Sequence, residues 1–306
     1  MLPNAGLKPA YDKAVWMYVY RDFTQSPADV KAERVSLRLS VTSWPQLVLV
    51  DPDTVEVVGS TGRTEDTFLR AVDRAAARVR ASETSAAADR IADADARAAE
   101  LESSSNVQLA RRYLDDDDIV VRYRALHVLA EKDPKFVAKQ AVALLQVPND
   151  TFRYDVCTTL GTVGRKDARG ALESLVRNPV HSRNPNVLRI RAVSALATCG
   201  NRDSVSAIRP LTRGSYLNGL TGTAIKSVVE IAKSDPTARA EVRQILIESF
   251  PQQLEETPVH ARYCLALAKT VNAALADVTG KQQAFPETYD ESTRQHLIGA
   301  WTNAEP

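Results

Sequence analysis

From residue 152 the chain reads FRYDVCTTLGTVGRKD, and from residue 188 it reads LRIRAVSALATCGNRD. Aligned without gaps, the two stretches share an arginine at the second position, a leucine at the ninth, and a glycine and an aspartate near the end. A related stretch, VRYRALHVLAEKDPKF, starts at Val121, and a fainter one, LTGTAIKSVVEIAKSD, starts at Leu220. Self-similarity at spacings of about 30–36 residues is typical of stacked helical repeats. The chain is therefore predicted to be mainly α.

Each repeated stretch is expected to be the second helix of a pair. Residues 107–114 and 136–147 are predicted as first helices, and 119–132 as the second helix between them. The ends of the repeats carry capping signals. Glycine in a left-handed conformation commonly ends a helix, and aspartate is a favoured N-cap of the helix that follows. We expect these roles at Gly164 and Gly200 and at Asp167 and Asp203.

The paired helices, the turns with aspartate or proline, and the arginine one residue into each second helix resemble HEAT repeats of the short bacterial type. The resemblance covers residues 107–306 and implies an α-solenoid. Four repeats are expected, and a fifth pair from Ala238 to Ala276 would place Arg262 and Tyr263 as echoes of Arg122 and Tyr123. A capping helix from Glu291 to Trp301 is predicted to close the array.

Residues 1–80 differ from the repeats. Residues 14–23 are rich in aromatic and β-branched residues and predict a strand. A helix over 26–41 follows, with Ser26 as its N-cap and Pro27 at its first position. Strands at 47–50 and 55–62 then form a hairpin, and a final helix starts near Thr64 or Asp66. The predicted order is β-α-β-β-α.

This order resembles the C-terminal half of a thioredoxin-like fold, in which a cis-proline precedes the hairpin. Pro45, preceded by Trp44, matches that position. The half of the fold that carries the C-x-x-C dithiol has no counterpart in residues 1–80. We therefore expect a partial module of 1–80, and its unpaired sheet edge favours a segment upstream of Met1.

Residues 81–106 are dominated by Ala, Asp, Glu and Arg and have no bulky apolar stripe. They predict a solvated helical linker that buries little. The expected division is thus 1–80, 81–106 and 107–306.

No catalytic constellation is found. The run Asp115–Asp118 lacks the spaced oxygens and the distal Glu of a calcium loop, so we interpret Asp118 as a helix N-cap. The four histidines have no metal-site spacing, and neither a G-x-S-x-G nor a phosphate-binding glycine loop occurs. Cys157, Cys199 and Cys264 lie far apart and are interpreted as core residues. We expect no catalytic residues, no metal and no cofactor.

Arginines and tyrosines at recurring positions are the best candidates for a binding surface: Arg122, Tyr123, Arg124, Arg153, Tyr154, Arg189 and Arg191. One hypothesis is a groove for acidic peptides, carboxylates or phosphates. The other, which we favour, is that each arginine pairs with a turn aspartate such as Asp118 or Asp150 and ties neighbouring repeats together. Positions that must contact neighbouring repeats are the ones that recur.

The sequence therefore predicts a non-catalytic scaffold or adaptor that binds a protein or peptide partner. The alternative is a thioredoxin-like thiol–disulfide protein whose dithiol lies upstream of this start. Nucleic acid is an unfavoured partner because the net charge is only +1, and no membrane span is expected. Without a signal peptide the chain is predicted to be cytoplasmic as written, and exported if its start lies upstream.

Overall fold

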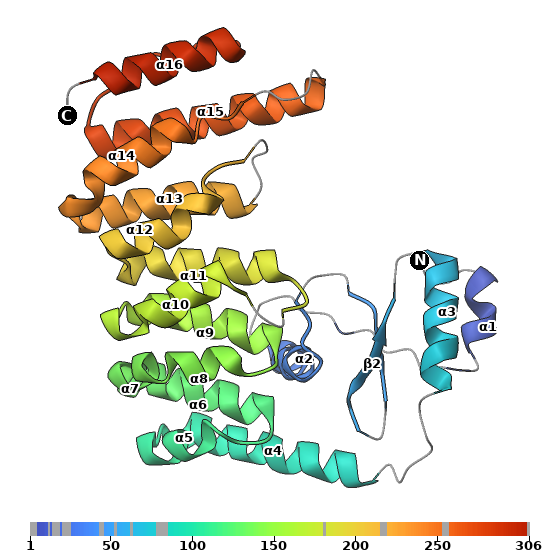
Figure 1. Cartoon of the computed structure of the whole chain (residues 1–306). Helices are drawn as coiled ribbons and strands as arrows, with labels where there is room; N and C mark the ends of the chain where they lie inside the picture. Colours follow the sequence, from blue (N-terminus) through green and yellow to red (C-terminus); the bar gives the residue numbers. More distant parts are fainter. Residues whose placement is uncertain are drawn as a thin grey trace. The chain divides into compact units, whose positions relative to one another are not determined.

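The computed structural model describes residues 5–11, 13, 19, 26–42, 46–51, 54–61, 64–77, 85–179, 182–214, 219–252 and 257–304 (Figure 1). These residues are mainly α-helical and include one two-stranded antiparallel sheet. The chain forms two compact units. The first contains Met1–Lys132 and Asn149–Phe152, and the second contains Asp133–Pro148 and Arg153–Pro306. The predicted division at residues 80 and 106 stays a prediction.

A small α/β core lies at the beginning of the first unit. Strands β1 (Val48–Val50) and β2 (Val57–Ser60) pair antiparallel, with Leu49 opposite Gly59. Helix α3 (Glu65–Ala76) follows, and Thr64 caps it by accepting a hydrogen bond from the backbone N–H of Thr67. The predicted hairpin and final helix are therefore present.

The apolar faces of three elements close this core. The 3-10 turn η1 (Ala5–Leu7), helix α1 (Lys8–Tyr11) and helix α3 contribute four buried side chains: Leu7, Ala10, Phe68 and Val72. Leu47 and Leu49 of the hairpin pack against them. Most of the predicted strand at 14–23, and the positions Trp44 and Pro45, lie outside the described residues.

Helix α2 (Pro27–Arg38) begins as its sequence predicts. The side chain of Ser26 accepts from the backbone N–H of Asp29, and Pro27 stands in the first turn. Helix α2 packs against α6 (Ile119–Lys132), a helix of the first repeat. The predicted bounds of α6 are confirmed.

Helix α4 (Ser85–Ser104) also packs against α6. A helix was predicted here, but the expectation that it buries little is wrong. Ala94, Ala98 and Leu101 recur at helical spacing and are almost completely buried. Alanine lets two helix backbones approach closely, so a stripe made mostly of alanines still forms a packing face. Helix α5 (Val107–Tyr113) completes the group and is capped by Asn106.

The second unit consists of helices joined by short turns. In chain order they are α7 (Pro134–Lys139), α8 (Ala141–Gln146), α9 (Asp150–Val163, whose first residues belong to the first unit), α10 (Arg169–Arg177), α11 (Pro185–Cys199), α12 (Arg202–Ile208), α13 (Gly219–Ser234), α14 (Arg239–Glu248), α15 (Pro258–Thr279) and α16 (Glu291–Asn303). Helices α11, α13 and α15 lie side by side in that order, with α10 against α11 and α14 against α15 (Figure 1).

Equivalent positions of the repeats are buried, which explains why the sequence recurs. Leu160, Leu196 and Val228 occupy one such position and are fully buried. Cys157 and Cys199 are also buried, as predicted. At Gly161 a methyl group would lie 3.1 Å from the Cα of Ala195, so a small residue there lets α9 and α11 pack closely.

The helix ends agree with the sequence in part. Gly164 has the predicted left-handed conformation, with φ of +63°. The same prediction for Gly200 is wrong, because its φ is −69° and its ψ is 170°. Glycine is needed there for space, since a Cβ would lie 2.4 Å from the carbonyl oxygen of Leu196.

The N-caps predicted from the repeated aspartates are also wrong. Asp203 lies inside the first turn of α12, and the N-cap is Asn201, whose side chain accepts from the backbone N–H of Ser204. Asp167 lies within the 3-10 turn Lys166–Ala168 and caps nothing. In each case the aspartate is still close to the positive end of a helix.

Helix α16 confirms the predicted C-terminal helix. Asp290 caps it, and Trp301 is fully buried near its end. The indole Nε1 of Trp301 donates a hydrogen bond of 2.7 Å to Oδ1 of Asn272 on α15. A buried indole N–H needs such a partner, so this bond fixes α16 against α15.

Candidate protein-binding surfaces

The first candidate surface is the face of α6 that holds helix α2. Tyr123 and Arg124, both predicted as binding residues, contact Glu33 of α2. The hydroxyl of Tyr123 donates to Oε1 at 3.3 Å, and Nη2 of Arg124 donates to Oε2 at 2.9 Å. Arg124 also pairs with Glu102 of α4 at 2.7 Å. These two positions therefore bind an acidic side chain presented by a helix.

Basic side chains of α2 complete the contact from the other direction. Arg38 donates from Nε to Asp118 at 3.0 Å and from Nη2 to Asp95 at 2.8 Å. Arg34 pairs with Asp95 at 3.3 Å. Burial of Arg38 acts to lower its pKa, but the bonds to Asp118 and Asp95 outweigh it, so the pKa is raised above its ordinary value. The guanidinium is thus held charged between two carboxylates.

Backbone contacts fix the end of α2. Nδ2 of Asn149 donates to the carbonyl of Leu37 at 2.6 Å, and this carbonyl also accepts from the backbone N–H of Ser40 at 3.1 Å. Just beyond, the hydroxyl of Thr151 donates to the carbonyl of Val41 at 2.9 Å. The sequence carried no signal for this contact, because the partners are more than 100 residues apart.

Two of the predicted arginines tie elements together, but their partners differ from those expected. Arg122 donates to the backbone carbonyls of Asp116 and Asp115 rather than to the carboxylate of Asp118. That carboxylate caps α6 by accepting from the N–H of Val120 at 2.8 Å, as predicted. Arg189 donates from Nε to the carbonyl of Val176, near the end of α10, at 3.1 Å. Helix C-termini favour cations. Backbone carbonyls at or near helix ends therefore accept from these arginines in place of the expected aspartate side chains.

The remaining predicted residues divide between core and surface. Arg153 and Tyr154 are buried, and the hydroxyl of Tyr154 donates to the carbonyl of Asn184 at 3.4 Å. Arg191 is exposed. The structure therefore brings Tyr123 and Arg124 together at a contact, buries two of the set, and leaves Arg191 exposed on α11.

Four further arginines play the same structural role and were missed by the sequence reasoning. Each donates to a carbonyl at or close to the end of a neighbouring helix: Arg169 to Cys199, Arg239 to Ala232, Arg294 to Phe250, and Arg243 to Trp301 and Ala304. They stand on first helices or on α16, where the repeats are too divergent to align by eye. The only feature of the sequence that could have indicated this role was an arginine near the start of such a helix.

Burial sets the register of the last repeat. Val121, Ala125 and Leu129 of α6 are buried, and His260, Cys264 and Ala268 of α15 are buried at the same spacing. The proposed echo of Arg122 and Tyr123 at Arg262 and Tyr263 is therefore shifted by one residue. Tyr263 takes the position of Arg124 and Arg191.

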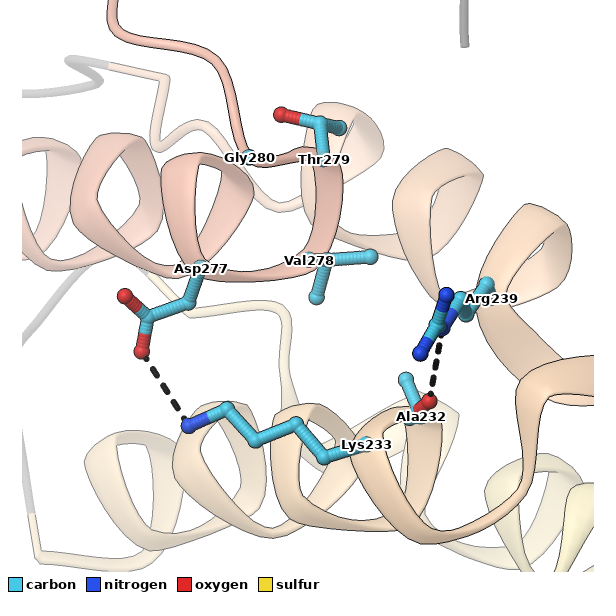
Figure 2. A pocket seen from close by; sticks show the side chains of 7 residues that line it. All are labelled: Ala232, Lys233, Arg239, Asp277, Val278, Thr279 and Gly280. Atoms are coloured by element: carbon cyan, nitrogen blue, oxygen red, sulfur yellow. Dashed lines mark hydrogen bonds and ion pairs between the residues drawn. The ribbon is translucent and has the colours of Figure 1, made fainter.

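A small hollow of about 270 Å³ lies where the ends of α13 and α15 meet the start of α14 (Figure 2). Its lining includes Lys233, whose Nζ lies 3.3 Å from Oδ2 of Asp277, and Arg239, whose Nε donates to the carbonyl of Ala232 at 3.2 Å. Hydrogen bonds to Glu230 and then Asp277 raise the pKa of Lys233. The lining charges are exposed and already paired, so the hollow has the character of an inter-helix junction.

The described thiols are poorly suited to catalysis. Burial raises the pKa of Cys157 to about 12 and also raises the pKa of Cys199 and Cys264. Nε2 of His260 lies 3.4 Å from Sγ of Cys264, but both side chains are buried. Because their pKa values are raised, the three thiols stay protonated at physiological pH. The reactive form of cysteine is the thiolate.

Within the described ranges, no cluster of three or more His, Cys, Asp or Glu is arranged to hold a metal ion. None of the helices described has the length and apolar character that crossing a membrane requires. Comparison of the chain with protein-family models, with curated proteins and with solved structures gives no match.

Proposed function

We propose that the helix pairs form an α-solenoid of HEAT-like repeats whose second helices present a surface for a protein or peptide partner, with no catalytic role. Three features support the proposal: paired helices in sequence order, burial at equivalent positions, and arginine ties to neighbouring helix ends. Repeats of this kind contact mainly their neighbours and leave one continuous face for binding.

The observation that carries the proposal is the contact of α2 with α6. A helix of this chain lies on the second helix of a repeat, and its Glu33 is bound by the repeated tyrosine and arginine positions. Arg34 and Arg38 of α2 both pair with Asp95 of α4, and Arg38 also pairs with Asp118 in the turn before α6. A helix-binding face built from repeat positions is what an adaptor requires.

A display library of random helical peptides, selected against the immobilised full chain, tests this function. Enriched peptides would be synthesised, labelled and titrated with the full chain by fluorescence anisotropy. We expect saturable binding with a dissociation constant below about 100 µM, which corresponds to roughly −5.5 kcal/mol. If no enriched peptide binds in solution, the proposed function is wrong.

A second candidate, a thioredoxin-like thiol–disulfide protein, is favoured by one observation, the β1–β2 hairpin followed directly by α3. We propose it only as the alternative, because the thiols of this chain are buried. The full chain should not accelerate the reduction of insulin by dithiothreitol. Acceleration that is lost on alkylation would favour this alternative over the binding role.

A further inference from the structure

A row of exposed cations crosses three neighbouring helices of the second unit. It consists of Arg191 on α11, Lys226 on α13, and Arg262 and Lys269 on α15, and we call it the basic row. Counted from the first aligned position of each repeat, which is Leu188, Leu220 or His260, these residues fall within about one third of the helix circumference. That sector is opposite the buried positions. Helices α11, α13 and α15 lie side by side (Figure 1), so residues in that sector of the three helices share one face.

The charges of the basic row form no ion pair with other residues that the structure describes. Lys269 lies near the ring of Phe285, at 5.9 Å from its centroid. Helix α11 carries no acidic residue at all. The acids of the other two helices, Glu230 and Asp277, both contact Lys233. The positive charges of the row are therefore not balanced by acids of their own three helices, and the nearest acid at an equivalent repeat position is Asp155 of α9.

Apolar side chains lie on the same face. Val259 is 62% exposed and Tyr263 is 42% exposed, and both stand on α15 within one turn of Arg262. An exposed apolar pair beside cations is typical of a surface that binds a partially apolar partner.

The first repeat shows what such a position binds. Arg124 and Arg191 are equivalent, each three residues after a buried start position, Val121 or Leu188. Arg124 is paired with Glu33, an acid carried on a helix. Arg191 presents the same charge with no ion-pair partner among the described residues.

We propose that the basic row binds an acidic amphipathic helix of a partner protein. This deepens the proposed function and rests on it. Carboxylates of the partner pair with Arg191, Lys226 and Arg262, while apolar side chains of the same helix cover Val259 and Tyr263. Charge complementarity selects the partner and its orientation, and the apolar contacts supply much of the affinity.

The probe is a labelled helical peptide with glutamates along one face and leucines beside them, and its control has glutamine at each glutamate position. Fluorescence anisotropy with the full chain would compare three proteins: wild type, Arg191→Glu with Lys226→Glu, and Lys139→Glu. Lys139 is an exposed cation of α7 and a matched control. Because the substituted side chains are exposed, circular dichroism and the melting temperature should stay unchanged.

We expect the glutamate peptide to bind wild type at least about tenfold more tightly than the glutamine peptide, with a loss of similar size in the double variant. Lys139→Glu should stay within about twofold of wild type, since it lies outside the row. A lysine version of the peptide should bind the double variant better than it binds wild type, which guards against a folding artefact.

Three outcomes would overturn the inference. Equal binding of the glutamate and glutamine peptides would show that charge does not select the partner. Unchanged binding by the double variant would show that the peptide binds at another surface. Tighter binding of a DNA duplex than of the peptide, at equal salt, would assign the row to nucleic acid. In the first two cases the library selection above still decides whether the chain binds helices, so failure of the inference and failure of the proposed function are distinguishable.

Discussion

Replacing Arg38 by methionine should release helix α2 without unfolding the rest of the chain. The substitution keeps an aliphatic side chain in place of the arginine stem but removes the bonds to Asp118 and Asp95. Both carboxylates then lose their shared cation. The matched control is Lys31→Met, at an exposed position of the same helix.

The structure sets the size of the effect. Arg38 has 11% of its side chain exposed, and its two partners have 20% and 33% exposed. A hydrogen bond to a charged group contributes about 1.5–3 kcal/mol when buried, and an exposed ion pair contributes at most about 1 kcal/mol. For this half-buried site we expect a loss of about 2 kcal/mol, equivalent to a rise of roughly 30-fold in the opening equilibrium of α2.

Hydrogen exchange followed by mass spectrometry measures that opening directly. Peptides from 29–38 should exchange about 30-fold faster in Arg38→Met than in wild type, while peptides from α13 should be unchanged. The reasoning is refuted if Arg38→Met and Lys31→Met give the same exchange in α2. An equal acceleration over the whole chain would also refute it, because the bonds would then stabilise the fold as a whole.

Three further predictions concern stability and reactivity. Gly200→Ala should lower the melting temperature, because its methyl group would lie 2.4 Å from a backbone oxygen, whereas Gly170→Ala meets nothing within 4 Å and should be neutral or stabilising. Trp301→Phe should lower the free energy of unfolding, measured by urea denaturation, by about 1–3 kcal/mol, since it leaves the buried Oδ1 of Asn272 without its 2.7 Å donor. An unchanged urea midpoint would contradict this prediction. Because burial raises the pKa of all three thiols, they are protonated at pH 8, and a disulfide reagent such as Ellman's should label them only after denaturation. Rapid labelling of the folded chain would disprove that assignment.

Helical periodicity was sufficient to predict most of the helices. The bounds of α6 and the start of α16 agree with the predictions. Each helix follows an aspartate N-cap and continues with apolar residues at regular spacing. The packing of α4 was missed because its buried residues are mostly alanines. Alanine gives a weak signal in sequence, although a close helix–helix approach depends on it.

The helix ends and the contacts of the candidate site were harder to predict. Local sequence does not distinguish a glycine required for left-handed backbone from one required for space, and Gly164 and Gly200 illustrate the two cases. The partners of Arg122 and Arg189 are backbone carbonyls. Every residue offers a carbonyl, so no pairing of residue types in the sequence pointed to them.

The recurring arginines therefore have two separate physical causes. Arg122 and Arg189 stand one residue after a buried start position, and Arg124 and Arg191 stand three residues after it. Those two places are about 200° apart around a helix, so they cannot serve the same contact.

The earlier place faces neighbouring carbonyls and keeps helix ends together. The later place faces outward, where Arg124 binds an acid of α2 and Arg191 does not pair within the described chain. Recurrence at the first place follows from the need to stack repeats, whereas at the second place the two arginines differ, since Arg124 pairs with acids of α2 and α4. We therefore attribute the outward arginines to a contact with another helix, which α2 provides at the first repeat.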